Sequence, residues 1–403
     1  GTGKNLSDAE WTEKEREQAR RNYTATEQDR RLVTTVKERF GEAKQAKDRY
    51  HEKWAECISF YESDFYRIWK PVLQQLVLNE DVPSWRVRTS DPQVLQLTLT
   101  IASKRTAARN ITTGQPNNPR DPEDVQAARL ATQVLRHLEQ VTNRTRNRIK
   151  ADLLSTIYGT AFLLPFWDPQ KKTKIGFEDP NGLARGVEAY AGDLGVEVLD
   201  VWQVFPQPVD EWDDLSWAVV ARVRPLEWVR ENFPERGPLV GPDHQEADLF
   251  AAPDREGYAP GDRASQKQPG KTVRVLELYE KPGRRYPKGR WLIVAGDYLL
   301  YSGDLPHPGG KFPLVPYVGI PIPGRVWAKG WVEDLVEQQR LLNRTESAIQ
   351  EHYNLCGRPK YKAPREANLD EDALHDGPGE VVEYDHPYEP DVMAPPPLGG
   401  LEN

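Results

Sequence analysis

Residues 144–168, RTRNRIKADLLSTIYGTAFLLPFWD, decide the fold, because a helical pattern changes into a strand pattern within them. Apolar residues recur at three- and four-residue steps as far as Ile157 and predict a helix. Gly159 suits the left-handed position that ends many helices. The apolar run 161–167 then predicts a strand. The chain therefore changes from helix to strand at this glycine.

Helices are predicted mainly before this stretch and strands mainly after it. The expected helices cover residues 7–21, 28–76 with breaks near Gly41 and Pro71, 91–114, a stretch that begins at Asp121, 226–233 and 332–355. The expected strands cover residues 161–167, 172–177, 196–205, 215–223, 273–279, 291–294 and 298–301. Residues 237–270 have no period and are expected to form an exposed, mobile insertion. This order predicts an α+β fold without internal repeats.

The composition argues against several classes of protein. The 403 residues exceed the size of a usual single core, so two or three packed modules are expected. No stretch approaches the roughly 20 apolar residues of a membrane span, and no secretory signal is predicted. Cys57 and Cys356 are far apart and the seven His are dispersed, which predicts no disulfide framework, metal site or cofactor. The net charge of −8 argues against a tight binder of nucleic acid, since phosphate contacts need a basic excess; a protein of this charge that handled DNA would be a conduit that avoids holding it.

The motifs of common enzymes are incomplete. Gly270-Lys271-Thr272 resembles the end of a phosphate-binding loop, but Ser265 stands where the first glycine is required. One acidic group is open to two interpretations: Asp210, Glu211, Asp213 and Asp214. These carboxylates could hold a divalent cation, but a solvated loop is the favoured interpretation. We therefore expect a protein that is not an enzyme.

Two basic clusters lie on predicted helices. They comprise Lys104, Arg105 and Arg109 on one helix and Arg144, Arg146 and Arg148 on another. Such side chains could contact phosphates or the acidic groups of a neighbouring subunit. The acidic total of the chain favours contacts between subunits, since most charge runs are solvated faces or salt-bridge partners.

The helix predicted over residues 332–355 has one apolar seam between two polar flanks. The seam consists of Val332, Leu335, Leu342, Ile349 and Tyr353. The flanks carry Glu333, Asp334, Glu337, Arg340, Arg344, Glu346 and Glu351. A helix that packs beside its own copies in a ring needs this pattern, although a single surface helix on a globular domain also shows it.

Four stretches, in this order, resemble the portal (head-to-tail connector) proteins of tailed bacteriophages, particularly the podovirus-type branch. They are residues 121–169, with YGT followed by a strand closing on WDP; 196–208, with FP at a bend; 273–300, a hairpin; and 332–364, with QRLLNR before a Ser and an RPK exit. The similarity spans most of residues 30–364.

The resemblance implies a subunit of a twelve-fold ring at one capsid vertex, through which DNA is packaged and ejected. Residues 1–325 would form a wing that contacts capsid and scaffold proteins, and 326–357 the stem helix. Residues 358–393 would form the clip, which meets the large terminase and later the head-tail adaptor and tail proteins. Residues 394–403 would begin a return segment, without the second stem helix, tunnel loop and crown. Such a protein resides in the virion, after assembly in the host cytoplasm, with no membrane partner.

The same resemblance implies three sets of site residues. The stem and channel candidates are Glu333, Glu337, Arg340, Arg344, Glu346 and Glu351. The candidates for partner docking on the clip are Arg358, Lys360, Lys362, Glu371 and Asp372. The wing candidates, for contacts with subunits or phosphates, are the two basic clusters. We expect an acidic channel face, because carboxylates that face phosphates reduce adhesion.

One alternative belongs to another class of protein. A metal-dependent nucleic-acid enzyme or packaging factor would use Asp210, Asp213 and Asp214 with Mg²⁺. Hydrolysis of DNA or ATP that disappears in Asp213→Ala would favour this alternative.

Overall fold

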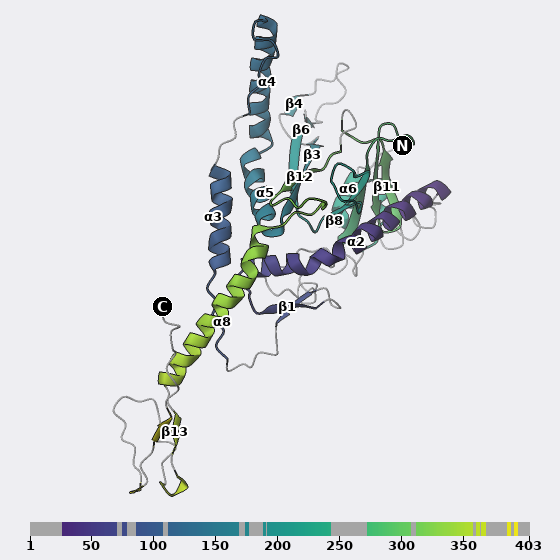
Figure 1. Ribbon diagram of the computed structural model, residues 1–403. Coiled ribbons are helices and arrows are strands. Elements are labelled where there is room, and N and C mark those ends of the chain that lie inside the picture. The colour runs from purple at the N-terminus through teal and green to yellow at the C-terminus, as the bar shows by residue number, and fades with distance from the viewer. Residues whose placement is uncertain are drawn as a thin grey trace.

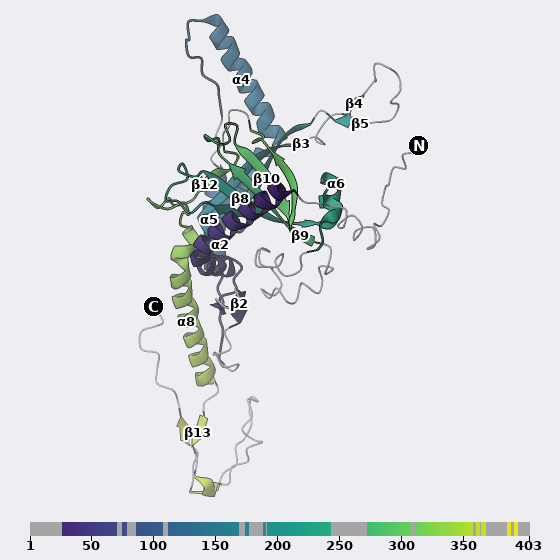
Figure 2. The ribbon, with the colours of Figure 1, turned by 90° about the vertical axis from the view of Figure 1, so that its right-hand side faces the viewer.

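The computed structural model describes residues 26–70, 75–78, 86–107, 112–168, 174–176, 188–190, 192–242, 272–307, 312–357, 360–362, 364–367, 385–387 and 391–393. This part of the chain is a mixed α+β structure, which confirms the coarse fold class. Its shape is elongated, because α8 (Trp331–Gly357) leaves one end of a central body and α4 (Pro122–Val141) leaves the other (Figure 1). A view from the side shows the same arrangement (Figure 2).

Two of the described helices, α2 (Glu27–Tyr61) and α4, begin at a residue whose side chain accepts a backbone N–H. Besides these and α8, the α-helices of the described residues are α3 (Gln93–Ala107), α5 (Arg144–Tyr158) and α6 (Leu226–Asn232). The Asp121 side chain accepts the Glu123 N–H at 3.0 Å, and Pro122 opens α4 as predicted. α5 ends at Gly159, whose φ of 90° confirms the predicted end of this helix.

Two antiparallel sheets form most of the body. The five-stranded sheet has the order β11 (Tyr298–Gly303), β10 (Arg290–Ala295), β9 (Thr272–Glu280), β8 (Trp217–Pro225) and β7 (Val204–Pro206). The three-stranded sheet has the order β12 (Val315–Val318), β3 (Thr160–Asp168) and β6 (Asp193–Leu199). Three two-stranded sheets pair β1 (Arg67–Lys70) with β2 (Gln75–Leu78), β4 (Lys174–Gly176) with β5 (Glu188–Tyr190), and β13 (Lys360–Lys362) with β14 (Asp391–Met393). The predicted hairpin around Gly296 is confirmed as β10 and β11.

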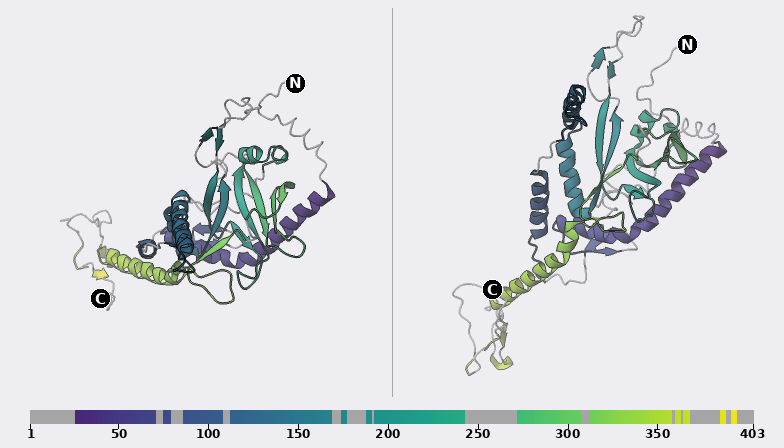
Figure 3. Two further views of the ribbon diagram at one scale, coloured as in Figure 1. Left: turned by 90° about the horizontal axis from the view of Figure 1, so that it is seen from above. Right: turned by 45° about the horizontal axis from the view of Figure 1, so that its top comes forward.

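α2 joins two packed regions of the body (Figure 3). Its N-terminal half packs Val36 and Phe40 on the five-stranded sheet, where the Phe205 ring meets Phe40 at 4.8 Å between centroids. Its C-terminal half places Trp54 in a second core that includes Val332 of α8. Burial of each such apolar side chain is worth about 1.5–3 kcal/mol, so α2 ties α8 to the sheet through packing.

The predicted helix 28–76 is wrong in its C-terminal third. α2 ends at Tyr61, Ser63 adopts a left-handed φ of 66°, and the hairpin of β1 and β2 follows. β1 contains the β-branched Ile68 and the aromatic Trp69, two residue types that favour strands. The predicted break near Gly41 is wrong, because α2 continues through this residue. The space beside Gly41 is open. Pro71 lies outside the described residues.

The predicted strand 196–205 is two strands that belong to different sheets. β6 ends at Leu199 in the three-stranded sheet, and β7 begins at Val204 in the five-stranded sheet. Between them the Asp200 carboxylate accepts the N–H groups of Trp202 at 2.9 Å and Gln203 at 3.1 Å. An aspartate that bonds its own backbone in this way makes a turn, and the turn interrupts the apolar run.

The prediction of an exposed insertion over residues 237–270 is wrong for its first residues. Gly237–Leu239 forms a short 3-10 helix, and Leu239 and Val240 are buried. Residues 243–271 lie outside the described residues, as does the helix predicted over 7–21. The helix predicted over 91–114 is described from Gln93 to Ala107.

Backbone segments meet without intervening side chains where α5 ends and α8 begins. A Cβ on Gly159 would collide with the backbone of Ala328, and one on Gly330 would collide with the backbone of Ile157. Gly319 donates its N–H to the Gly159 carbonyl at 2.7 Å. Only glycine permits such close approach, so this glycine joint sets α8 against α5 through the main chain.

Candidate functional site

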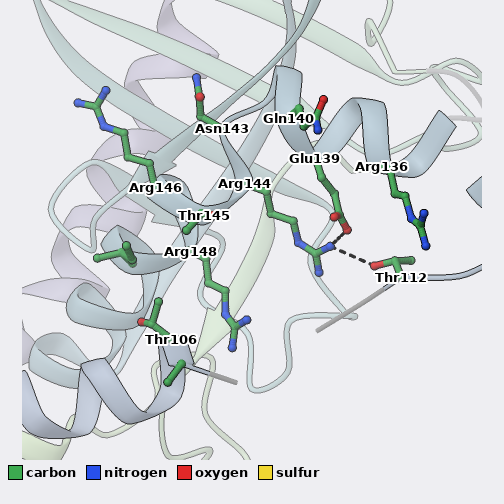
Figure 4. A pocket seen from close by; sticks show the side chains of 12 residues that line it. Thr106, Thr112, Arg136, Glu139, Gln140, Asn143, Arg144, Thr145, Arg146 and Arg148 are labelled. Carbon is green, nitrogen blue, oxygen red and sulfur yellow. Dashed lines mark hydrogen bonds and ion pairs between the residues drawn. The ribbon is translucent and has the colours of Figure 1, made fainter. Parts of the chain in front are cut away.

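An arginine-lined hollow lies where α3, α4 and α5 meet (Figure 4). Its volume is about 1100 Å³. Its walls carry four guanidinium groups, which belong to Arg136, Arg144, Arg146 and Arg148. α4 turns into α5 at Asn143, whose left-handed φ of 50° is a conformation that asparagine tolerates well. This sharp elbow brings the last turn of α4 and the first turn of α5 to one hollow, which we call the arginine hollow.

The four arginines differ in what they contact. Arg144 pairs with Glu139 and donates to the Thr112 hydroxyl at 3.0 Å (Figure 4). Arg136 and Arg146 are exposed and form no hydrogen bond or ion pair within the described part of the chain. These two guanidinium groups are therefore available to an anion or to a carboxylate of another chain.

Asp152 engages the remaining predicted arginines from within the protein. Its carboxylate is fully buried and lies 3.2 Å from Arg105 and 3.6 Å from Arg148. The Tyr317 hydroxyl donates to it at 2.6 Å, and burial together with this bond raises the pKa of Tyr317. Arg105 and Arg148, with Tyr317, thus hold α3, α5 and β12 together through one buried carboxylate.

The sequence contains one signal for the pairing of Asp152 with an arginine. Asp152 lies four residues after Arg148 on the same helix, at the spacing of an intrahelical ion pair. Lys104 is exposed at the end of α3, and Arg109 lies outside the described residues. The described members of the two basic clusters therefore share one region of the fold, where Arg105 and Arg148 contact the buried Asp152 and Lys104 is exposed.

The polar residues predicted on α8 are partly engaged by the body of the same subunit. Glu333 accepts from Lys53 at 2.9 Å, and Arg340 pairs with Glu56 of α2 and with Glu337. Further along the helix, Arg86 and the Val87 N–H contact Glu351 at 3.4 and 3.3 Å. Arg344 is exposed and Glu346 is half-exposed. The structure thus distributes the stem candidates around α8 and does not gather them.

The buried side of α8 differs from the predicted apolar seam. The residues that the subunit buries are Val332, Val336, Gln339 and Asn343. Gln339 donates to the Asp91 carbonyl and to the Asn343 side chain, both at 2.7 Å. Their i, i+4 spacing was the available signal for this buried polar pair. Apart from Val332, the seam residues lie roughly a quarter turn away, because successive residues are about 100° apart on a helix.

The clip candidates are described only in part. Lys360 and Lys362 belong to β13, which pairs with β14 at the far end of α8 (Figure 1). Lys362 lies 3.8 Å from Asp391 across the two strands. Arg358, Glu371 and Asp372 lie outside the described residues.

A buried lysine that the sequence did not indicate lies at the centre of the body. Lys47 of α2 donates to the carbonyls of Trp202 at 3.2 Å and Val204 at 3.1 Å, and its amine lies 3.6 Å from the centre of the Phe205 ring. Burial lowers the pKa of Lys47 well below its usual value, although the charge of Asp200 opposes this shift. One polar group in α2 thus holds the turn between the two sheets.

His51, one turn further along α2, makes stability depend on pH. Burial and the nearby charges of Lys47 and Lys44 lower its pKa from 6.5 to about 4. Between these values the unfolded chain binds a proton that the folded chain does not, so stability falls as the pH falls from about 6.5 to about 4. The full effect is about 3 kcal/mol, and His51→Gln should remove most of this dependence. Urea unfolding at several pH values measures it, with exposed His137→Gln as the control that should leave the dependence unchanged.

The acidic group of the sequence does not converge on a site. Asp210, Glu211, Asp213 and Asp214 are exposed between β7 and β8. Among the residues that the structure describes, no group of three or more His, Cys, Asp and Glu could hold a metal ion. This geometry gives no support to the metal-dependent alternative.

Comparisons of the chain with known protein families and curated sequences give no match. None of the helices in the described ranges combines the length and apolarity needed to cross a membrane.

Proposed function

We propose that this chain is a structural subunit of a portal-type ring through which double-stranded DNA passes. The observation that carries the proposal is the partly exposed apolar seam of α8 together with the exposed Leu341. In a monomer, the apolar side chains of this long projecting helix would be exposed to water, and exposed apolar patches of this kind mark interaction sites. Copies that pack side by side around an axis would cover them.

The seam is exposed in a graded way along α8. Val332 is buried at the base, Leu335, Leu342 and Ile349 are half-buried, and Tyr353 near the tip is 54% exposed. On the opposite side from the buried residues, Leu341 is 65% exposed. α8 therefore offers apolar contacts on two sides, as a helix with one neighbour on each side in a ring requires.

α4 supports assembly in the same way at the other end of the subunit. It has an amphipathic pattern, yet none of its residues is buried, and Leu130 is 62% exposed. Helices gain most of their stability in proteins by packing an apolar face. A neighbouring wing that packs on α4 would supply the missing contact.

The charge of α8 fits a channel wall. The helix carries five acidic residues, Glu333, Asp334, Glu337, Glu346 and Glu351, and two arginines, Arg340 and Arg344. Lys53, Lys329 and Arg86 of the same subunit pair with Glu333, Asp334 and Glu351. Glu346 makes no ion pair within the described residues, and its repetition around an axis would reduce the adhesion of passing DNA. The small sheet of β13 and β14 would then stand at the mouth of the channel, where terminase and adaptor proteins dock.

Native mass spectrometry and negative-stain imaging of the purified chain test the proposal. We expect a hollow ring, because closed symmetry satisfies every seam. The resemblance to portal proteins implies about twelve subunits in it. The double variant Leu341→Glu and Ile349→Glu should shift the protein to monomers and leave the subunit folded. The matched control, Gln350→Glu and Asn354→Asp, adds the same charge at exposed positions of α8 that lie away from the seam and from Leu341, and should still form rings. A compact dimer, or rings that form equally well in both variants, would contradict the proposal.

A further inference from the structure

We propose that a second basic site on the body, the basic groove, binds the phosphate groups of a nucleic-acid backbone. The basic groove lies between the N-terminal half of α2 and the hairpin of β9 and β10, with a volume of about 800 Å³. It lies away from α8, near the opposite end of α2 (Figure 1). This inference goes beyond the proposed function and does not depend on ring formation.

The basic groove is strongly positive within an acidic chain. Its walls carry six cations, Arg31, Arg39, Lys281, Arg284, Arg285 and Arg290, and two acids, Glu27 and Glu280. The difference, 6 − 2, is four excess positive charges, whereas the whole chain carries −8. Such a local excess concentrates anions at the site.

The base of the groove is held rigidly. The carboxylate of Glu280 is buried and pairs with both Arg39 and Arg290. Arg290 also donates to the Tyr286 hydroxyl at 2.9 Å, and its guanidinium lies 4.3 Å from the centre of the Tyr286 ring. A charged group held in this way is placed before a ligand arrives, which reduces the entropy lost on binding.

The rim of the groove has cations that no acid neutralises. Arg284 and Arg285 are exposed and make no ion pair within the described residues, and the Arg285 guanidinium lies 5.6 Å from the Tyr286 ring centre. Arginine forks match phosphate oxygens in pairs. Two adjacent exposed arginines can contact more than one phosphate, which suits the repeated phosphates of a polymer.

An acidic peptide fits the observations less well. The exposed loop with Asp213 and Asp214 lies beside the groove, because Lys281 donates to the Asp213 carbonyl at 2.8 Å. Even so, the carboxylates of this loop make no ion pair with the groove arginines in the described structure. The groove thus leaves a tethered acidic segment unbound, and a phosphate backbone is the better ligand.

Fluorescence anisotropy of a short labelled DNA duplex, titrated with the full chain at several salt concentrations, tests the inference. The double variant Arg284→Ala and Arg285→Ala should weaken binding at least about tenfold and reduce the salt slope by about 2. Asp213→Asn with Asp214→Asn should strengthen binding, because it removes repulsion beside the groove. The matched control, Arg120→Ala with Arg129→Ala, removes the same charge from exposed positions at α4 and should leave affinity unchanged.

Three outcomes would overturn the inference. The first is equal duplex affinity of the groove variant and the α4 control. The second is displacement of the duplex by polyglutamate as readily as by polyphosphate, which would assign the groove to acidic peptides. The third is displacement by inorganic phosphate at low concentration, which would assign it to a free anion. Because the measurement reports on one subunit's surface, failure of ring assembly leaves its result interpretable.

Discussion

Asp152→Ala is expected to lower the free energy of unfolding by about 3–5 kcal/mol, because it leaves two half-buried guanidinium groups without their anion. Asp152 is fully buried, and Arg105, Arg148 and Tyr317 converge on its carboxylate from three different elements. Without the carboxylate, the positive charges of Arg105 and Arg148 would repel one another. Urea denaturation followed by tryptophan fluorescence measures the loss.

Two further variants provide comparisons for the stability loss of Asp152→Ala. Tyr317→Phe removes one hydrogen bond from the same cluster and should cost about 1 kcal/mol. Glu211→Ala removes an exposed carboxylate and should stay within about 0.5 kcal/mol of the unmodified protein. An Asp152→Ala variant as stable as Glu211→Ala would show that the buried cluster does not hold the three elements together.

Lys47→Ala is expected to cost a similar amount, about 3–5 kcal/mol, for a different reason. The substitution empties a buried volume between α2 and the five-stranded sheet and leaves the carbonyls of Trp202 and Val204 without their donor. Burial raises the pKa of Asp200, and the substitution also removes the positive charge of Lys47 that opposes this rise. The turn that separates β6 from β7 should therefore loosen, and thermal or urea unfolding measures the change.

Lys47→Met tests how this cost divides between packing and hydrogen bonding. Methionine fills much of the same volume without an amine, so the remaining loss reports on the two carbonyls, at about 1–3 kcal/mol. An Ala variant no less stable than the Met variant would show that the packing of the lysine stem contributes nothing.

The sequence predicted elements well where the signals were local. Asp121 and Pro122 begin α4, Gly159 ends α5, and Gly296 turns the β10–β11 hairpin. Each of these features depends on a few neighbouring residues and their backbone preferences. The end of α2 at Tyr61 and the change of sheet at Asp200 depend instead on tertiary contacts, which no local period reports.

The sites were harder to predict than the fold, because charge reveals little about burial. The sequence placed Arg105 and Arg148 in basic clusters, but it did not indicate that both pair with the buried Asp152, which lies in an ordinary helical pattern. Lys47 looked like any exposed lysine of a charged helix, yet it is fully enclosed. The basic groove had a visible signal in the run 281–290, KPGRRYPKGR, whose significance appears only once α2 lies beside it.

The glycine joint makes the tilt of α8 a property of the main chain. Side chains around Gly159 and Gly330 can change without altering that tilt, because no side chain lies between the touching backbones. In the proposed ring of identical subunits, an angular error in one subunit recurs in every other, and the errors accumulate around the circumference. Main-chain contact keeps this error small while the outer surfaces remain free to diverge. Related chains could thus acquire different partners and still close a circle of the same diameter.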